Sequence, residues 1–257
     1  NEVRAYKSTH VLFISPDSLD ADLVGRLEKA GITVALYMWD SFENKPNVVK
    51  ALDSIARKAS FDPSDVTNFG LSHIDLFAES DFFCNYSVDV DRSYDLTFVG
   101  TAHSNRPEVL KNLINSRFLG KLNTKIHLFS GNIYYGIVAR LKLYNCSSLQ
   151  VTSEKLSKSE CASLFRSSRY VLDITHKDQR GLTSRSFEAL AAGSYLVTNN
   201  SWAPKLLPEF SDRIIVFSNS SAPDIASFRW EESNYSDSQR QHLSLNNFCH
   251  KLIVLLN

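Results

Sequence analysis

The chain has 257 residues, in which 28 lysines and arginines balance 28 aspartates and glutamates, and 43% of its residues are hydrophobic. This length can bury a substantial core in one large domain or in two smaller ones. Because there is no basic surplus to neutralise a phosphate backbone, the composition argues against a nucleic-acid partner.

The cysteines and the lengths of the apolar runs predict the cellular compartment. The four cysteines are widely spaced, with no pair at metal-ligand spacing. We expect buried free thiols, as in a reducing cytosol, although a secreted chain with four cysteines could form two disulfides. No apolar run approaches the roughly 20 residues of a membrane helix, and the first residues do not form a signal peptide. The sequence therefore predicts a cytoplasmic protein whose contact with the inner face of a membrane would be peripheral.

The first 90 residues alternate between apolar runs, typical of buried parallel strands, and helical patterns. The predicted strands are 10–15, 32–38, 60–62 and 75–77. The predicted helices are 19–30, which Gly31 ends, and 47–58. The polar and aromatic stretch 78–94 lacks a clear period, so we expect a linker there and place a domain boundary near residue 90.

The rest of the chain alternates in the same way. The predicted strands are 95–100, 126–130, 170–174, 195–198 and 214–217. The predicted helices are 107–116, 157–167 with a capping box of Ser157 and Glu160, 184–192 and 239–256. This alternation predicts an α/β protein of two doubly wound lobes, 1–90 and 91–257, with ligands at the carboxyl ends of the strands. The last helix could cross back to the first lobe.

The segment 173–188 gathers charged, amide and hydroxyl side chains between a predicted strand and a predicted helix. Gly181 would let the backbone approach a ligand closely. The amides of Leu182, Thr183 and Ser184, at the start of the helix, could bind phosphate oxygens. Arg185 would add a fixed cation beside them.

Glu188 lies about one helical turn beyond those amides, where its carboxylate could accept both hydroxyls of a ribose. Phosphate-binding amides followed by such a carboxylate predict a nucleotide site. The alternative is an ordinary capped helix on which Glu188 pairs with Arg185, three residues earlier. The spacing leaves both interpretations open.

At this point the sequence resembles a known family. The motif Leu-Asp-Ile-x-His-x-x-Gln-x-Gly-Leu-Thr-x-Arg-x-x-Glu-Ala-Leu-Ala-Ala-Gly at 172–193, with the runs 37–41 and 98–101, resembles bacterial surface-polysaccharide glycosyltransferases. These are group-1 enzymes of the spore maturation protein B-like (CgeB-like) type. The similarity, over roughly residues 10–217, implies a GT-B fold of two Rossmann-like lobes. The N-terminal, acceptor-side lobe would be incomplete, and the C-terminal lobe would hold the nucleotide sugar.

The resemblance implies roles for particular residues. Glu188 would take the ribose, the segment 181–185 the diphosphate, and the helix beginning near Leu156 would flank the base. The predicted donor-binding residues are Gly100, Thr101, Arg106, Asp173, Gln179, Gly181, Leu182, Thr183, Ser184, Arg185 and Glu188. Many members carry a second glutamate eight residues before the ribose-binding one, but Arg180 stands here. The donor sugar and the stereochemical outcome therefore stay open.

Three residues are candidates for the chemistry. Asp40 and Asp17 each follow a predicted strand, so either could deprotonate an acceptor hydroxyl if the enzyme inverts. Asp40 could instead cap its own loop. His176 could donate to the leaving phosphate or only brace its loop. Tyr134 or Tyr135 could stack on a base or sugar, with core packing as the alternative.

The predicted reaction is hexosyl-type transfer from a UDP- or GDP-linked sugar to a glycan. Because a helix dipole and arginines can stabilise a leaving diphosphate, we expect the enzyme to need no metal and no other cofactor. The expected acceptor is a cell-surface glycan, such as lipopolysaccharide or capsule, or a lipid-linked glycan. The alternatives are a GT-B sugar-nucleotide epimerase and a non-catalytic module that binds nucleotide sugar or glycan.

Overall fold

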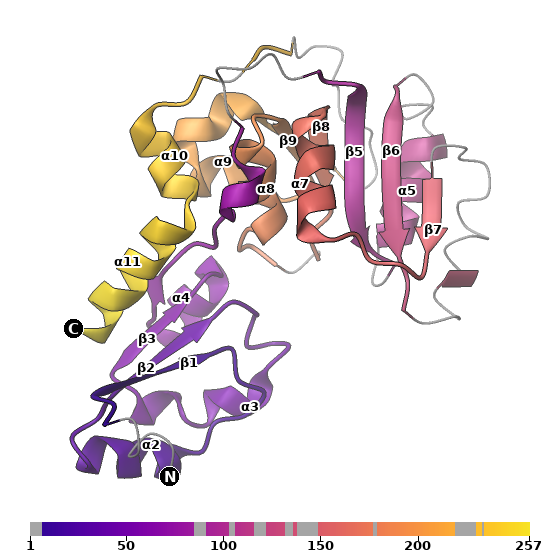
Figure 1. The fold of residues 1–257 in the computed structure, drawn as a ribbon. Coiled ribbons are helices and arrows are strands. Elements are labelled where there is room, and N and C mark those ends of the chain that lie inside the picture. Colours follow the sequence, from indigo (N-terminus) through magenta and orange to yellow (C-terminus); the bar gives the residue numbers. More distant parts are fainter. Residues whose placement is uncertain are drawn as a thin grey trace. The chain divides into compact units, whose positions relative to one another are not determined.

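The computed structural model describes residues 7–84, 91–102, 106–115, 122–131, 136–137, 149–176, 179–218, 230–232 and 234–257. The chain divides into two compact units (Figure 1). Their limits are Asn1–Leu76, Gln179–Gly181 and Leu245–Asn257 for the first, and Phe77–Asp178 and Leu182–Ser244 for the second. The first segment of the first unit thus ends at Leu76, whereas the sequence predicted a domain boundary near residue 90. The same unit also includes the last helix. Tyr134 and Tyr135 lie outside the described residues.

The first unit is built on a four-stranded sheet with the order β1-β2-β3-β4. Its strands are β1 (His10–Ile14), β2 (Thr33–Met38), β3 (Arg57–Ser60) and β4 (Ser72–His73). Its helices are α2 (Ala21–Lys29), α3 (Pro46–Val49), the 3-10 helix η1 (Leu52–Ser54), α4 (Pro63–Phe69) and α11 (Leu245–Leu256). All three strand pairs are parallel, so crossover connections join them.

The two faces of this sheet are covered by different helices. Leu36 of β2 is buried in one cluster with Val24 of α2 and Val48 of α3. On the opposite face, Tyr37 packs edge-on against Phe248 of α11, with ring centroids 5.2 Å apart. Because alternate residues of a strand point to opposite faces, β2 is buried on both, as its continuous apolar run predicted.

Residues 47–61 fold differently from the prediction. The helix predicted over 47–58 is wrong, because the chain forms α3 and then η1, and residues 57 and 58 already belong to β3. Lys58 donates from Nζ to the carbonyl oxygen of Leu52 at 2.8 Å, so this charged side chain ties the strand to η1. The strand predicted at 75–77 is also wrong, since the edge strand is β4.

The short helix α4 was not predicted, although its signals are present in the sequence. Asp62 is its N-cap and accepts from the amide of Ser64 at 2.7 Å. Pro63 occupies the first turn, and Gly70 ends the helix with a φ of 63°. Seven residues are too few to show a helical period, so only the capping residues could have revealed α4.

The second unit is built on a six-stranded sheet with the order β10-β9-β8-β5-β6-β7. Its strands are β5 (Tyr94–Thr101), β6 (Thr124–Phe129), β7 (Leu149–Thr152), β8 (Ser168–Asp173), β9 (Tyr195–Thr198) and β10 (Ile214–Val216). Its helices are η2 (Ser80–Phe82), α5 (Arg106–Asn115), α7 (Lys158–Arg166), α8 (Ser184–Ala191), α9 (Ala203–Leu206), η4 (Pro208–Arg213) and α10 (Asp237–Leu243). All pairs are parallel, and β7 was not predicted.

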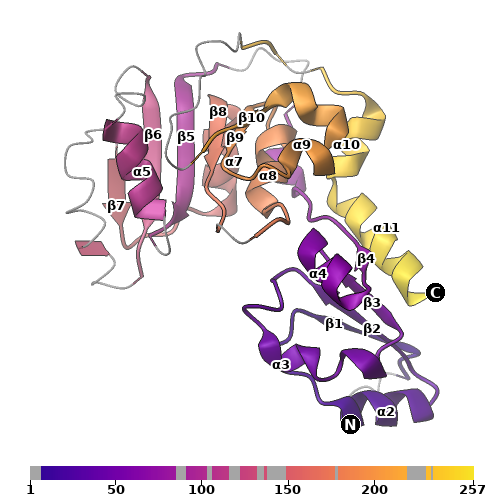
Figure 2. The ribbon, with the colours of Figure 1, turned by 180° about the vertical axis from the view of Figure 1, so that it is seen from behind.

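Helices cover both faces of the second sheet. The helices α7 and α8 lie in front of it in Figure 1, and α5 lies in front of it in the reverse view of Figure 2. The predicted capping box at the start of α7 is confirmed, with Ser157 as N-cap and Glu160 as its partner. This two-sided cover, with all strands parallel, is the doubly wound arrangement that the sequence predicted.

The helix predicted over 239–256 is two helices. Ser244 is extended between α10 and α11, and the break leaves α10 in the second unit and α11 in the first. Among the residues that the structure describes, no helix is both long and apolar enough to cross a membrane.

A buried carboxyl group gives the first unit a pH-dependent stability. Asp65 is 6% exposed and accepts from the amide of Phe42 at 3.2 Å and from Oγ of Ser60 at 3.3 Å. Burial raises the pKa of Asp65 to about 6, and the charges of Asp62 and Asp40 act in the same direction. Because this pKa lies above the unfolded value of about 3.9, stability is lost as the pH rises from about 4 to about 6.

We therefore expect Asp65→Asn to raise the free energy of unfolding by about 1–2 kcal/mol at pH 7 and by much less at pH 4. The amide keeps the acceptor oxygen and removes the buried charge. Urea denaturation at pH 4, 5.5 and 7 measures the difference, with the exposed Asp53→Asn as control. A gain of the same size at all three pH values would show that the charge of Asp65 is not its cause.

Candidate nucleotide-binding site

The strand order of the second unit defines where a ligand would bind. From β5 the chain proceeds outward through β6 and β7, and it then returns to place β8 on the other side of β5. The strands β5 and β8 are therefore neighbours whose following connections leave in opposite directions. Open parallel sheets bind ligands at the carboxyl ends of such a strand pair. Thr101 ends β5 and Asp173 ends β8, so both stand at this switch point.

Asp173 holds the start of α8 against the end of β8. Its side chain is fully buried. Its Oδ1 accepts from Nη1 of Arg185 at 2.9 Å, and its Oδ2 accepts from Oγ1 of Thr183 at 2.9 Å and from Oγ of Ser186 at 3.0 Å. Both carboxylate oxygens are thus occupied by protein donors. Asp173, predicted as a donor-binding residue, acts in the structure by positioning α8.

The first turn of α8 keeps backbone donors without a side-chain cap. Thr183 is the N-cap, but its hydroxyl donates to Asp173 and caps no amide of the helix. The amide of Ser186 donates to the carbonyl of Thr183 at 3.0 Å, which leaves those of Ser184 and Arg185 at the open end. Ser184 is exposed, and the side chain of Leu182 is buried. Of the predicted amides of Leu182, Thr183 and Ser184, that of Ser184 lies at the open helix start, and the amide of Arg185, which was not predicted, lies beside it.

Two guanidinium groups meet at the switch point. Arg106, at the start of α5, donates from Nε to the carbonyl of Ile174 at 3.2 Å and from Nη1 to that of Thr101 at 3.4 Å, so it bridges the ends of β8 and β5. Burial lowers the pKa of Arg106 to about 10, helped by the charge of Arg185 and opposed by that of Asp173. Arg185 pairs with Asp173, and Arg106 lies near enough for the charges of both residues to act on it, so positive charge that suits an anion is concentrated here.

The ring of Phe98 supports Arg185, and Gly100 leaves room for that ring. The guanidinium of Arg185 lies over the ring of Phe98, 5.6 Å from its centroid. A Cβ atom on Gly100 would come within 2.6 Å of that ring. Gly100, predicted to face the donor, is thus required by the packing of Phe98, a contact that the sequence analysis missed.

Glu188 stands on the second turn of α8 and does not pair with Arg185, whose partner is Asp173. Burial raises the pKa of Glu188 to about 7; the positive charges of Arg185 and Lys158 oppose this rise, and Asp173 adds to it. The half-buried Glu188 accepts no hydrogen bond from the described part of the chain. The sequence alternative of a Glu188–Arg185 pair is therefore wrong, and this carboxylate is available to a ligand.

Lys158 and Glu79 were missed as neighbours of Glu188. Lys158, on the first turn of α7, donates to the carboxylate of Glu79 just before η2. This hydrogen bond raises the pKa of Lys158, and the negative charge of Glu188 contributes. The helix predicted to flank a base thus places an ion pair near the predicted ribose position. In the sequence, only the position of Lys158 just after the N-cap of α7 could have indicated that its side chain lies near Glu188.

Residues 179–181 group with the first unit, whereas the sequence predicted Gln179 and Gly181 as donor-binding residues of the C-terminal lobe. The amides of Arg180 and Gly181 both donate to Oδ2 of Asp62 at 3.0 Å. Nε2 of Gln179 donates to the carbonyl of Gly181 at 2.8 Å. A Cβ atom on Gly181 would lie 2.8 Å from the carbonyl oxygen of Phe61, so the glycine is required by this contact.

The predicted chemical groups lie in different units. His176 is exposed just past β8 in the second unit. Asp40 and Asp17 belong to the first. Oδ1 of Asp40 accepts from the amide of Ser41 at 2.9 Å and from Nδ2 of Asn44 at 2.8 Å. The predicted loop-bracing role of Asp40 is therefore present, and among the described residues its Oδ2 accepts no hydrogen bond.

Asp17 is less suited to act as a base. Its side chain is 92% exposed and forms an ion pair with Lys45. The hydrogen bond and charge of Lys45 hold the pKa of Asp17 below its usual range. A carboxylate stabilised in this way accepts a proton less readily.

Part of the chain matches the model of a known protein family. Residues 116–231 match the family model described as "Glycosyl transferase-like". This segment includes Asp173, Arg185 and Glu188. A comparison with curated proteins found no match.

Solved structures show the same fold at low sequence identity. The Anabaena protein HepE in complex with UDP and glucose is 11% identical, with a TM-score of 0.66 over 98% of this chain and 79% of that one. A Rickettsia africae glycosyltransferase is 11% identical, with a TM-score of 0.62 over 99% and 78%. The Neisseria meningitidis UDP-GlcNAc 2-epimerase bound to UDP-GlcNAc is 9% identical, with a TM-score of 0.52 over 99% and 77%. The chain has the GT-B fold of two Rossmann-like units, shared by glycosyltransferases and sugar-nucleotide epimerases.

We expect Asp173→Ala to lower the free energy of unfolding by about 3 kcal/mol, because it leaves Arg185 without its partner and two hydroxyls without their acceptor. Thr183→Val, which removes one of the three donors, should cost about 1 kcal/mol. Urea denaturation measures both. Equal losses in the two variants would contradict the central position given to the carboxylate.

Proposed function

We propose that the chain is a glycosyltransferase whose second unit binds the nucleoside diphosphate of a nucleotide sugar at the switch point. The observation that carries the proposal is the convergence there of two guanidinium groups, a helix start without a side-chain cap, and the carboxylate of Glu188, which pairs with none of the residues that the structure describes. Amides and arginines suit a diphosphate, and a carboxylate suits the two hydroxyls of a ribose. The family-model match over residues 116–231 supports the same function.

The chemistry follows from where negative charge develops. As the bond from the sugar to the diphosphate breaks, charge accumulates on the departing phosphate oxygens. Arg106, Arg185 and the first amides of α8 would stabilise it without reorganising. Because these donors would stabilise the departing charge, we include metal independence in the proposal, to be tested by activity in EDTA.

The proposed acceptor is a hydroxyl of a growing glycan. Asp40 is the proposed base, because one of its oxygens anchors the loop while the other stays available. His176 is the proposed donor to the departing phosphate or to a sugar hydroxyl. A lipopolysaccharide, capsular or lipid-linked acceptor, with the reaction at the inner face of a membrane, rests on the family resemblance alone.

The direct test is incubation of the purified protein with UDP- and GDP-sugars in the presence of glycan acceptors, with detection of the glycosylated product. A product that forms only when both donor and acceptor are present supports the transferase. Asp40→Asn should lower the turnover at least about a hundredfold and leave the nucleotide affinity unchanged. Asp53→Asn is the matched control.

A sugar-nucleotide epimerase is the second candidate, because the N. meningitidis epimerase, whose structure contains UDP-GlcNAc, has the same fold. Such an enzyme would need the same nucleotide site but no acceptor. Incubation with a nucleotide sugar alone, followed by analysis of the sugar, separates the two. An epimerised sugar without acceptor would replace the transferase proposal.

The role of Glu188 predicts a pH-dependent affinity. Its ionised form accepts the ribose hydroxyls, and the pKa of Glu188 in the empty site is raised to about 7. UDP or GDP should therefore bind more tightly as the pH rises from 6 to 8, by up to about tenfold. Isothermal titration measures this dependence. Glu188→Gln should bind at least about tenfold more weakly at pH 8 and lose the dependence, whereas Glu28→Gln should change neither.

The role of Arg106 predicts discrimination between nucleotide and nucleoside. Arg106→Met should weaken the binding of UDP or GDP by at least about tenfold and leave that of the corresponding nucleoside unchanged. Titration with both ligands measures the difference. Equal losses for nucleotide and nucleoside would mean that Arg106 supports the fold and does not bind phosphate.

A further inference from the structure

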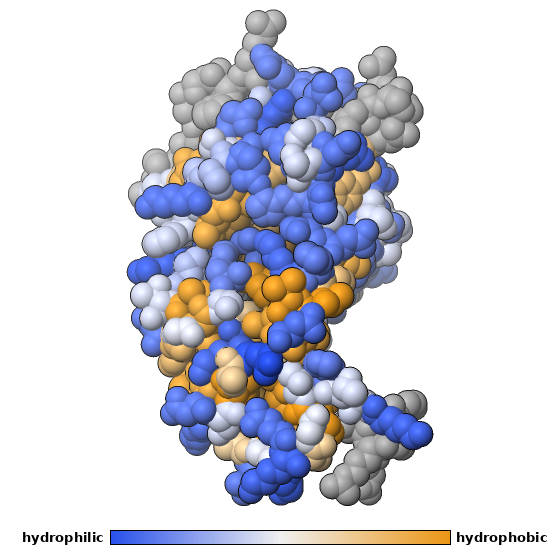
Figure 3. Space-filling model, turned by 90° about the vertical axis from the view of Figure 1, so that its left-hand side faces the viewer, coloured by the Kyte–Doolittle hydropathy of each residue, from blue (hydrophilic) through white to orange (hydrophobic). Residues whose placement is uncertain are grey.

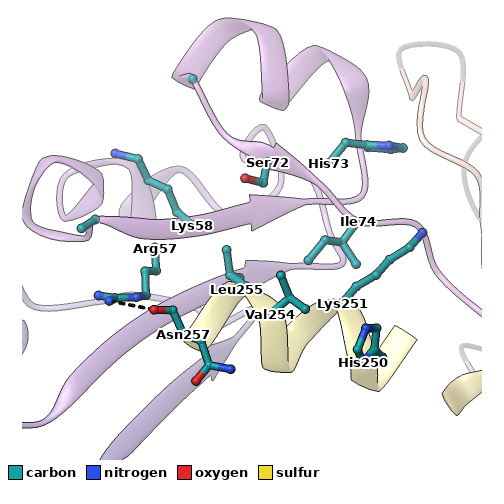
Figure 4. A pocket seen from close by; sticks show the side chains of 12 residues that line it. Arg57, Lys58, Ser72, His73, Ile74, His250, Lys251, Val254, Leu255 and Asn257 are labelled. Atoms are coloured by element: carbon teal, nitrogen blue, oxygen red, sulfur yellow. Dashed lines mark hydrogen bonds between the residues drawn. The ribbon is translucent and has the colours of Figure 1, made fainter. Parts of the chain in front are cut away.

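A pocket of about 610 Å³ opens in the first unit, between the last turns of α11 and the edge of the sheet (Figure 4). Arg57 and Lys58 of β3 line it on one side and Val254 and Leu255 of α11 on the other. All the lining residues belong to the first unit, and none belongs to the proposed nucleotide site. The pocket is therefore a separate feature of the molecule.

The floor of the pocket is apolar. In Figure 4 the side chains of Ile74, Val254 and Leu255 point toward one another at its centre. The side chain of Val254 is 61% exposed and so is open to a ligand. Figure 3 faces the side on which α11 lies in Figure 1 and shows apolar side chains gathered there between hydrophilic ones. These surfaces would gain free energy from contact with a hydrocarbon.

The rim of the pocket is basic. Arg57, Lys58 and Lys251 line it together with two histidines, and no aspartate or glutamate is among the lining residues. Just outside, the carboxylate of Asp75 lies 3.4 Å from Lys251 and 3.6 Å from His73. Lys58 donates to the backbone carbonyl oxygen of Leu52, and Arg57 donates to an oxygen of Asn257 at 3.5 Å. Three cationic side chains therefore stand beside the apolar floor, against the one carboxylate side chain of Asp75.

This combination favours one class of ligand. A simple inorganic anion would leave the apolar floor uncovered. An acidic peptide would have to extend the sheet at β4, but β4 has only two residues and offers too few backbone partners for strand addition. A molecule with an anionic head and a hydrocarbon chain satisfies both the rim and the floor.

We propose that this pocket binds an anionic amphiphile, with the head at Arg57 and Lys251 and the hydrocarbon chain on Ile74, Val254 and Leu255. The probe is dodecyl phosphate, used at concentrations at which it is monomeric. Titration should show saturable binding to one site, at least about tenfold tighter than that of dodecyl maltoside or inorganic phosphate. Equal affinity for the charged and the neutral amphiphile would overturn the proposal.

Adjacent residues of α11 provide a matched pair of variants. Val254 lines the pocket, whereas Ile253 is 56% exposed and does not line it. Val254→Asp should weaken the binding of dodecyl phosphate at least about tenfold, and Ile253→Asp should leave it within about twofold. Both side chains are largely exposed, so both variants should fold. An equal effect of the two substitutions, or none from either, would contradict the assignment.

The head-group contacts have their own test. Arg57→Gln combined with Lys251→Gln should weaken binding at least about tenfold, whereas Arg26→Gln combined with Lys29→Gln, on α2, should not. Melting temperatures show whether each pair folds. Sedimentation with phosphatidylglycerol vesicles separates a bilayer from a single molecule. Binding to vesicles without binding to monomeric dodecyl phosphate would overturn the pocket proposal in favour of a surface contact.

Discussion

The carboxylate of Asp173 is the contact on which the proposed site depends. It is fully buried at the end of β8, and its three donors are Arg185, Thr183 and Ser186, all at the start of α8. Such a charge is tolerated inside a protein only when it is paired and hydrogen-bonded. Because all three donors come from one helix turn, satisfying the carboxylate also fixes the direction of the helix.

The other end of α8 is held by a buried cation. Arg92 donates to the carbonyl of Ala192, at the C-cap of α8, at 3.0 Å, and to that of Ser168, at the start of β8, at 2.9 Å. A guanidinium at a helix C-terminus and a carboxylate contact at its N-terminal turn both suit the helix dipole. Thus α8 is fastened at both ends, while its first amides stay without a side-chain cap.

The charges around α8 are the basis of the proposed nucleotide site. Arg106 and Arg185 both lie near the buried carboxylate of Asp173, and we propose that a diphosphate binds beside them. Glu188 is one turn farther along, without an ion-pair partner among the described residues, and burial raises its pKa to about 7. Arginines at the helix start and a carboxylate one turn farther along are the arrangement that we propose for a diphosphate joined to a ribose. Such perturbed groups concentrate at functional sites.

The sequence predicted the parts of the fold that are governed by local pattern. The buried strands β2, β5, β8 and β9, the capping box of α7 and the start of α8 all carry signals within a few residues. The prediction of a helix over 47–58 is wrong because the charged residues Arg57 and Lys58 are typical of an exposed helix end. In the structure they belong to β3, which pairs with β2 in the sheet. Short β7 and α4 lack a visible period.

The candidate site was also predicted only in part, because only the contacts between residues close in sequence leave a local signal. The sequence singled out Asp173, Arg185 and Glu188, which lie close together along the chain. It could not show that Arg185 would pair with Asp173, because Glu188 at i+3 offered a local partner. Gly181 was assigned to phosphate on its flexibility, yet its amide donates to Asp62, a contact between residues 119 positions apart. Long-range pairing of this kind has no local signature.

The most direct test of the account is to follow the backbone amides of the ¹⁵N-labelled protein while UDP or GDP is added. The account predicts saturable shifts of the amides of Ser184 and Arg185 at the open start of α8, with little change at Arg180 and Gly181, whose amides already donate to Asp62. Shifts confined to residues away from the end of β8 and the start of α8, or no shift with either nucleotide, would contradict it.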